Sequence, residues 1–424
     1  MVEIPRTMAA RFRDRFTACR RGGRTLSGSS VPERQRESAN TEEDFNVGLF
    51  LLSFFLIYGG FHLYFFLKIR AAFAPGGAAQ ILLIALLLLG LMAPVIVRAS
   101  ERYGFEVLAR LISWTGYLWM AMILLFVSVS LLLELYRLFV HLAGLILRND
   151  VGALLPSART LFLLPALAAL VMVLYGFFEA LSIRSEPLVI HSAKIPKEAG
   201  RIRIVQISDV HVGVLIRGRY LAEILRRVRE TAPDLLVSTG DLVDGQGNDL
   251  SEAAAQFREI RPRYGKFAVT GNHEFYAGID EAMEFTVHAG FTPLRGKVAT
   301  IAGAVDLVGV DDPGRHGLGF QRRPSDREVL AQASGGRFTI LLKHQPLVDK
   351  ESPGAFDLQL SGHTHKGQLF PFSLLTRLVF PFHHGNYRLA NGALLHVSRG
   401  TGTWGPPVRF LSPPEITVID LMPE

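Results

Sequence analysis

The sequence almost lacks cysteine: Cys19 is the only one among 424 residues. A single cysteine cannot form a disulfide within the chain, and it argues against a structural zinc site built from thiolates. The sequence also lacks a basic stripe interleaved with aromatic residues, which would indicate a nucleic-acid surface, although the formal net charge is +7. We therefore expect no disulfide framework and no nucleic-acid partner.

Apolar residues, by contrast, are abundant. They make up 49% of the chain, which is too much for a wholly soluble protein of this length. The excess lies in four runs near the N-terminus, namely Asn46–Leu67, Ala79–Val97, Leu111–Leu133 and Thr160–Phe178. Each approaches or exceeds the roughly 20 residues that a helix needs to cross about 30 Å of hydrocarbon.

These runs predict four transmembrane helices. The alternative is a set of buried core helices in a large all-α domain, but runs such as "ILLIALLLLGLMAPVIV" show no polar face. A fifth apolar stretch, Leu138–Leu147, is too short to span, and we expect it at the membrane interface.

Three regions are expected: a disordered basic tail (1–45), a transmembrane region of about four helices (46–183) and an α/β domain (190–424). The tail is rich in arginine, which favours the cytoplasmic side of a cell inner membrane. Four crossings return the chain to that side, so the α/β domain is expected in the cytoplasm. Basic residues beside the spans suit anionic headgroups, which makes membrane lipids expected partners.

The α/β domain is indicated by short β-branched runs that alternate with helical patterns. The expected strands cover residues 201–208, 234–240, 266–271, 305–310, 337–344, 356–362, 393–398 and 415–421. Helices are expected around Leu221–Val228 and between Asp280 and Gly290. We predict two packed β-sheets flanked by helices, and we expect a chain cut near Ile190 to fold alone.

Nearly every metal-capable residue of this domain follows a predicted strand. The set is Asp209, His211, Asp241, Asn272, His273, His344, His363 and His365. Taken singly, each has an ordinary interpretation, such as a turn former or a hydrogen-bonded core histidine. Taken together at converging strand ends, they would cost many kcal/mol to desolvate without a cation. The pattern therefore predicts a metal site.

The donors outnumber what one ion needs when a solvent position stays open, so two ions fit better, about 3.5–4 Å apart. Mixed imidazole, carboxylate and amide ligation favours a divalent transition metal, with Mn expected first and Fe or Zn as options. All-oxygen Mg or Ca sites are disfavoured.

The blocks "DVH", "GDLVDG", "GNHE", a later lone His and "GHTH" occur in this order from about Arg201 onward. This order resembles the calcineurin-like metallophosphoesterase superfamily. The closing stretch "SRGTGTWGPPVRFLSPPEITVIDL" is similar to the membrane-associated YkuE/YaeI-like subgroup. The N-terminal half resembles no family that we can name.

The resemblance implies roles for individual residues. One ion would be bound by Asp209, His211 and His365, the other by Asn272, His344 and His363, with Asp241 bridging both. His273 would not be a ligand; by family analogy it steadies the phosphoryl oxygens or protonates the leaving group. In an extended segment, the single Thr364 between His363 and His365 would let both imidazoles point the same way.

The expected function is that of a metal-dependent phosphoric ester hydrolase anchored in a membrane. It would hydrolyse a phosphomonoester, phosphodiester or pyrophosphate bond by attack of a metal-bridging hydroxide, with a phosphate-containing small molecule or a lipid as substrate. The alternative is a membrane sensor or binding protein in which the phosphoesterase domain is regulatory. The sequence leaves the oligomeric state open.

Several residues in or beside the predicted metal motifs have expected roles other than metal binding. Asp244 and Glu274 are expected to orient ligands rather than bind metal. Lys366, Arg399 and Arg409 could clamp a substrate phosphate or form solvated salt bridges.

The apolar segment Gly367–Phe382 could pack in the core, admit an acyl chain or touch the bilayer, and core packing is preferred. Glu134 and Glu179 are expected to reach the interface at span ends. His383 and His384 are expected at the surface or behind the ligands.

Overall fold

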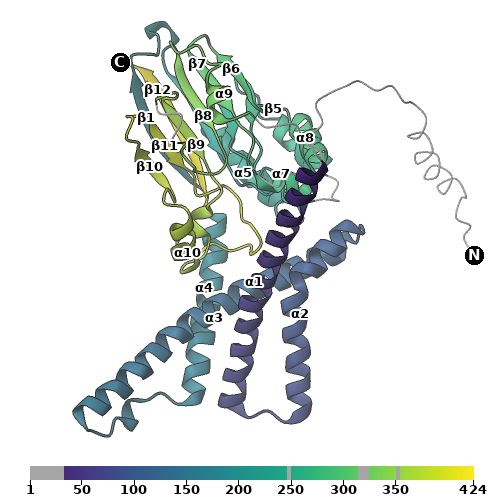
Figure 1. The fold of residues 1–424 in the computed structure, drawn as a ribbon, viewed down its shortest axis with the longest axis vertical. Helices are drawn as coiled ribbons and strands as arrows, with labels where there is room; N and C mark the ends of the chain where they lie inside the picture. The colour runs from purple at the N-terminus through teal and green to yellow at the C-terminus, as the bar shows by residue number, and fades with distance from the viewer. Residues whose placement is uncertain (1–32, 246–249, 314–323, 350–353) are drawn as a thin grey trace, which may run out of the picture. The chain divides into compact units, whose positions relative to one another are not determined.

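The computed structural model describes residues 33–245, 250–313, 324–349 and 354–424 (Figure 1). The chain divides into two units, Met1–Ser53 and Phe54–Glu424. The predicted disordered tail falls largely on residues 1–32, outside the described residues. Helix α1 begins at Glu33, so residues 33–45 are helical where the sequence analysis expected tail.

Four long apolar helices precede the α/β domain, as predicted. They are α1 (Glu33–Phe73), α2 (Gly77–Arg102), α3 (Glu106–Leu147) and α4 (Ala158–Leu181), and a short 3-10 helix (Gly152–Leu154) precedes α4. By length and composition, each contains a segment that could cross a membrane. Their exposed surfaces are crowded with leucine, isoleucine and valine, which suits a lipid environment better than water.

Helix α3 is unusually long. It runs without a break from Glu106 to Leu147 and so includes the stretch Leu138–Leu147, whose expected place at a membrane interface remains a prediction. A helix of 42 residues is about 63 Å long at 1.5 Å per residue, roughly twice the hydrocarbon thickness. If α3 crosses a membrane, one of its ends must project from the bilayer or the helix must tilt strongly.

The α/β domain contains two six-stranded sheets, as expected from the alternating pattern. The first has the order β1 (Arg184–Ser192), β12 (Glu415–Pro423), β2 (Ile202–Ile207), β3 (Leu235–Ser238), β4 (Lys266–Ala268) and β5 (Thr292–Pro293). The second has the order β10 (Gly385–Arg388), β11 (Leu394–Val397), β9 (Leu358–Ser361), β8 (Phe338–Leu342), β7 (Val305–Gly309) and β6 (Lys297–Ile301). Strands β2, β3 and β4 run parallel, as do β7, β8, β9 and β11.

One apolar core lies between the two sheets, where Ile204 and Leu235 of the first sheet pack with Ile340 and Leu360 of the second. Helices cover the outer faces. Helices α5 (Gly218–Glu230), α6 (Ser251–Arg258) and α8 (Ile279–His288) pack on the first sheet, and α9 (Asp326–Leu330) packs on the second. The remaining helices are α7 (Asn272–Ala277), α10 (Phe372–Val379) and two 3-10 turns at Lys197–Ala199 and His365–Gly367.

The first strand of the domain, β1, was not expected from the sequence, where the first expected strand covers residues 201–208. Strand β1 starts at Arg184 and pairs in parallel with β12 over its whole length. A chain cut near Ile190 would lose most of this strand, so a cut after Ser182 is the better boundary. The division into tail, membrane region and α/β domain otherwise remains a prediction.

The membrane-helix region and the α/β domain share an apolar cluster. Leu369 and Val408 of the domain are buried with Ala121 of α3, and Val173 and Phe177 of α4 pack against them. The amide of Arg409 also donates to the carbonyl oxygen of Gly176 in α4. The domain is thus packed directly against two of the apolar helices.

Candidate metal centre

The carboxyl ends of parallel strands bring the predicted residues together. Asp209 follows β2, Asp241 follows β3 and Asn272 follows β4, while His344 follows β8 and the "GHTH" motif follows β9. Two groups result. We call Asp209, His211 and His365 the first group, and Asp241, His344 and His363 the second group; in each, one donor atom per residue lies within 4.8 Å of the others.

The backbone at these positions is left-handed, which is rare for residues other than glycine. The φ values are 53° at Asp209, 55° at His211, 51° at Asp241, 72° at His363 and 48° at His365. Each such residue costs on the order of 1–3 kcal/mol, and such strain clusters at functional sites.

This geometry corrects the explanation given for the "GHTH" motif. His363 and His365 are not in an extended segment: Thr364 between them has αR dihedrals and a short 3-10 turn starts at His365. The left-handed residues, rather than a strand's alternation, turn both imidazoles into the site. Gly362 is required for close approach, since a Cβ there would lie 2.3 Å from Oδ2 of Asp209.

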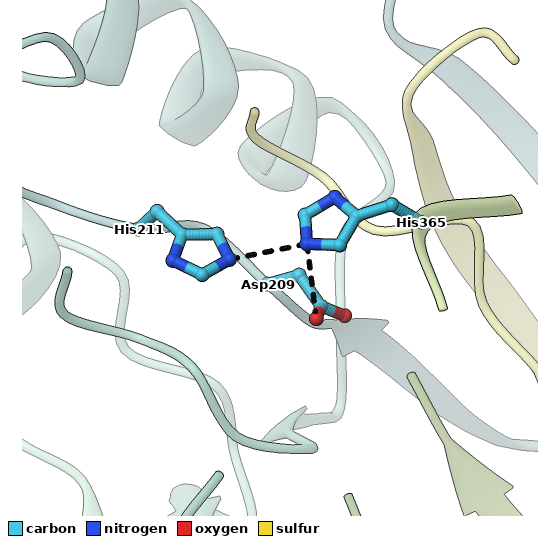
Figure 2. A group of neighbouring side chains, drawn as sticks. All are labelled: Asp209, His211 and His365. Atoms are coloured by element: carbon cyan, nitrogen blue, oxygen red, sulfur yellow. Dashed lines mark hydrogen bonds and ion pairs between the residues drawn. The ribbon is translucent and has the colours of Figure 1, made fainter. Parts of the chain in front are cut away.

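In the first group, Nε2 of His365 lies 3.1 Å from Nε2 of His211 and 3.4 Å from Oδ1 of Asp209 (Figure 2). The three side chains are buried. Asp209 also accepts hydrogen bonds from the backbone amide of His363, at 3.0 and 3.1 Å. This contact ties the first group to the loop that carries the second.

In the second group, Nε2 of His344 lies 3.2 Å from Oδ2 of Asp241 and 3.1 Å from Nδ1 of His363. The side-chain oxygen of Asn272 is 3.0 Å from Nδ1 of His363 and 3.2 Å from Nε2 of His344. Nδ1 of His344 lies 2.8 Å from the carbonyl oxygen of Thr239, which fixes the ring. His363 and Asn272 are half-buried, so solvent reaches this side of the site.

Asp241 lies between the groups. Its Oδ2 is 3.2 Å from Nε2 of His344 and 3.8 Å from Nε2 of His211. Glu274 orients this loop from behind, as expected: its carboxylate accepts hydrogen bonds from the amides of Asp241, Leu242 and Gly271. A carboxylate used in this way is not free to bind an ion.

His273 stands beside the first group. Its Nδ1 lies 3.1 Å from Oδ1 of Asp244, and Oδ1 of Asp244 lies 3.4 Å from Nδ1 of His211. His273, Asp244 and His211 thus form a further cluster with one donor atom each within 4.8 Å. Asp244 thus lies close to both imidazoles, and its expected role in orienting ligands remains a prediction.

The protonation states are set by burial and neighbouring charge. Burial alone would raise the pKa of the Asp241 carboxyl, but the imidazoles of His344 and His273 hold it well below its usual range. Burial lowers the pKa of His363 to about 3, and it holds the pKa of His365 well below its usual value. Burial thus keeps His363 and His365 neutral, as metal ligation requires. Burial would also lower the pKa of His344, but the charge of Asp241 holds it well above its usual value.

The spacing and the chemical type of the donor atoms fit a metal ion. Ligand atoms that share one ion, each about 2.0–2.2 Å away, are themselves about 3–3.5 Å apart. The contacts of 3.1 Å between ring nitrogens, namely His211 to His365 and His344 to His363, have this spacing. All donors are nitrogen or oxygen, as a divalent transition metal prefers.

Arg409 supports the first group, whereas the sequence analysis favoured a phosphate clamp or a solvated salt bridge equally. Its guanidinium is fully buried and donates to the carbonyl oxygens of Arg399, Gly402 and Ser412. Its Nη2 also lies 3.2 Å from Nδ1 of His365. Arg409 is therefore neither a phosphate clamp nor part of a solvated salt bridge.

The apolar helices also contact the residues that hold His365 and His211 in place. Glu179 of α4 is buried, and its carboxylate accepts a hydrogen bond from the amide of Ser412 at 3.3 Å, whereas the sequence analysis expected it at the interface. Ser412 in turn donates through Oγ to the carbonyl oxygen of His365. From α2, Nη2 of Arg98 lies 3.8 Å from Oδ1 of Asp244. No sequence pattern signals these contacts, because they join distant segments.

Ion pairs and burial decide the roles of three further parts of the chain named in the sequence analysis. Arg399 pairs with Glu186 and Glu415. His383 is buried, with Nε2 2.7 Å from Oγ1 of Thr376, so it is not a surface residue. The preference for core packing of Gly367–Phe382 is wrong for its helix, because α10 contains no buried residue.

Known proteins agree with this architecture. Residues 202–367 match the family model described as calcineurin-like phosphoesterase. A metallophosphoesterase of Aquifex aeolicus is 39% identical over 249 residues, which cover 58% of this chain and 95% of that one. A bovine (Bos taurus) relative named transmembrane protein with metallophosphoesterase domain is 32% identical over 306 residues, covering 68% of each chain.

The metallophosphoesterase YkuE of Bacillus subtilis is 31% identical over 265 residues, covering 58% of this chain and 89% of its own. Among solved structures, a dimetal phosphatase of Danio rerio is similar over 47% of this chain and 87% of that one, at 14% identity. Its TM-score is 0.34.

Two sheets with metal-capable residues at their strand ends define a metal-dependent phosphoester hydrolase. The chain belongs to the calcineurin-like phosphoesterase family. The predicted class of enzyme, the two-sheet fold and the four preceding apolar helices are thereby confirmed.

Proposed function

We propose that this protein is a membrane-anchored phosphoesterase that uses two divalent transition-metal ions, Mn first, on a lipid-linked phosphate ester or pyrophosphate. The observation that carries the proposal is the meeting of two buried donor groups at one carboxylate, Asp241. Asp209, His211 and His365 would hold one ion, and Asn272, His344 and His363 the other, with Asp241 shared.

When bound, two such ions supply a water of lowered pKa as nucleophile and offset charge on the phosphoryl oxygens. The proton needed in the reaction would come from a residue of the chain. Burial would lower the pKa of His273, but the charges of Asp241 and Asp244 raise it to about 9, so His273 holds a proton near neutral pH. That proton can stabilise a phosphoryl oxygen or pass to the leaving group.

Membrane anchoring is supported by the ends of three apolar helices. The last turns of α2 and α4 contact the α/β domain through Arg98 and Glu179, and the first turn of α3 approaches it through Glu106, whose Oε2 lies 3.8 Å from Arg217. If these helices cross a membrane, all three ends lie on one side, as an even number of crossings before the domain requires. The arginine-rich tail favours the cytoplasm for that side.

The function is tested with the full-length protein in detergent, stripped of metal and reloaded with Mn. Elemental analysis should give about two ions per chain. Turnover should be measured on p-nitrophenyl phosphate, bis-p-nitrophenyl phosphate, phosphatidate and a nucleotide-diphosphate-linked acyl sugar. Metal binding without turnover on any of these would favour the alternative, a sensor with a regulatory phosphoesterase domain.

The orientation is tested with reporters fused after Glu424. A reporter active only in the cytoplasm should work, and one that requires the periplasm should not. The opposite result would reverse the topology without affecting the metal assignment.

A further inference from the structure

Helix α10 presents apolar side chains to the surroundings at an unusual density. Phe372, Leu374, Leu375, Leu378 and Val379 are all exposed, and Leu378 is 81% exposed. An exposed cluster of this kind marks a contact site, because isolated soluble domains rarely tolerate it.

The helix is amphipathic. At 100° per residue the five apolar side chains fall on one side, while Ser373, Thr376 and Arg377 fall on the other. The polar side contacts the domain itself, since Oγ1 of Thr376 lies 2.7 Å from Nε2 of the buried His383. The apolar side is therefore the one left for an outside partner.

The residues just before α10 already lie among the apolar helices. Leu369 is buried with Ala121 of α3, and Val173 and Phe177 of α4 pack against the same cluster. Gln368 and Phe370 exchange backbone hydrogen bonds with Phe410, at 2.9 and 3.1 Å.

The ring of Phe410 packs edge-on against Tyr175 of α4, with centroids 5.9 Å apart. Figure 1 draws α10 at the same end of the α/β domain as α4. The exposed apolar side of α10 thus begins a few residues after a segment that packs on α3 and α4.

We propose that α10 is an interfacial helix whose apolar side lies in the headgroup and upper acyl region of the bilayer that holds α4. The inference rests on the membrane crossing in the proposed function. Exposed Arg377, near the level of the headgroups, would suit anionic lipids. A bilayer is the occupant that the packing of the preceding segment on α4 favours, because α4 has the same surroundings along its exposed face.

The position of α10 also bears on the substrate. The helix is followed by Phe380, whose ring centroid lies 4.9 Å from that of His363, the half-buried member of the second group. A bilayer on α10 would therefore extend to the accessible side of the candidate metal centre. The favoured substrate is an amphiphile whose phosphate lies at headgroup depth in the same leaflet.

Because Cys19 is the only cysteine, single-cysteine labelling can measure depth directly. In a Cys19→Ser background, a nitroxide label is attached at Leu378→Cys, and the full-length protein is placed in vesicles of phosphatidylcholine and phosphatidylglycerol. Accessibility to oxygen, which concentrates in lipid, is compared with accessibility to a water-soluble nickel chelate. The label should lie about 5–10 Å into the interface and show an oxygen-to-nickel ratio several-fold above an aqueous control.

Three matched positions complete the experiment. Glu284→Cys on α8 is the aqueous control, and Arg377→Cys tests the polar side of α10. Leu167→Cys on the exposed face of α4 is the lipid control. We expect the ratio to fall in the order Leu167, Leu378, Arg377, Glu284.

A nickel accessibility at Leu378 equal to that at Glu284, with Leu167 in lipid, would overturn the inference while leaving the anchoring intact. Water at both Leu378 and Leu167 would overturn the anchoring as well. Protection of Leu378 from both reagents, with spin coupling between two labels, would mean that a second copy covers α10, and it would also overturn the inference. The measurement needs no substrate, so it is independent of activity.

Discussion

The two candidate metal positions use similar ligands but are supported by different parts of the chain. The second group is held within the α/β domain, through Thr239 behind His344 and Glu274 behind Asp241. The first group is held by elements that touch the apolar helices. Arg409 and Ser412 fix His365 and are bonded to α4, while Asp244 faces His211 and Arg98 of α2.

The difference indicates that the apolar helices help to support the first group. Arg409 donates its backbone amide to α4 and its side chain to the loop around His365. A movement of α4 relative to the domain would therefore disturb the first group before the second. The predictions that follow test this division, starting with the residue that joins the groups.

Asp241→Asn should have the largest effect, because an amide cannot supply negative charge to two cations. We expect turnover below detection and weakened binding of both ions, measured by assay with p-nitrophenyl phosphate and by elemental analysis. Asp280→Asn, an exposed position on α8, is the matched control and should behave as wild type. Loss of only one ion would show that Asp241 belongs to one group alone.

His273→Ala should reduce turnover by roughly 10²–10⁴-fold with metal content near wild type, because His273 supplies a proton rather than a ligand. The loss should be smaller for p-nitrophenyl phosphate than for phenyl phosphate if the proton goes to the leaving group. If the variant instead loses an ion, His273 is a ligand, and His344 or His363 must give up its assigned place.

Arg409→Met should weaken one ion by about 10–100-fold and leave the other near its original affinity, because only the first group loses its support. Burial lowers the pKa of Arg409 to about 10, so the wild-type side chain is charged at neutral pH. Chelator competition, followed by elemental analysis, measures both affinities. Equal loss of both ions would remove the distinction between the groups.

Glu274→Gln is the change in the second group that corresponds to Arg409→Met in the first, because Glu274 lies behind Asp241. The carboxylate accepts several backbone amides there, and the neutral amide is a weaker acceptor. We expect the ion of the second group to be the more affected. An effect confined to the first group would contradict the proposed division.

Asp244→Asn should shift the pH dependence of turnover. Asp244 helps to raise the pKa of His273 to about 9, so removing its charge lowers that pKa. His273 then loses its proton at a lower pH, and the alkaline limb of the pH–rate profile should move to lower pH. A limb that stays in place or moves upward would mean that His273 does not act as the acid.

Arg98→Gln should give the smallest effect, less than about tenfold in turnover. Its guanidinium is 3.8 Å from Asp244 and the side chain is 45% exposed, and pairs of this kind are weak. Loss of this positive charge beside Asp244 favours protonated His273, so a small shift of the alkaline limb to higher pH, opposite to that expected for Asp244→Asn, would show that α2 acts on the site through Asp244. Arg102→Gln, in the last turn of the same helix, serves as control.

Much of the site could be predicted from the sequence, because donor chemistry and strand ends are local features. The "DVH", "GDLVDG", "GNHE" and "GHTH" blocks carry their residue types and spacing within a few positions. Parallel strands then bring such blocks to one edge whatever the details of packing. The edge strands β1, β5, β6 and β10 were missed. The last three have only two to five residues, which give little periodicity.

By itself the sequence determined the four apolar segments, the two-sheet class and the set of metal-capable residues, since hydrophobicity and ligand type belong to the residues themselves. Only the tertiary structure decided that Arg409 serves His365, that Glu179 is buried against Ser412, and that α10 turns its leucines outward. Those outcomes depend on which distant segments meet. An arginine or a leucine has the same chemistry in a core, at an interface or in lipid, and its neighbours determine its role.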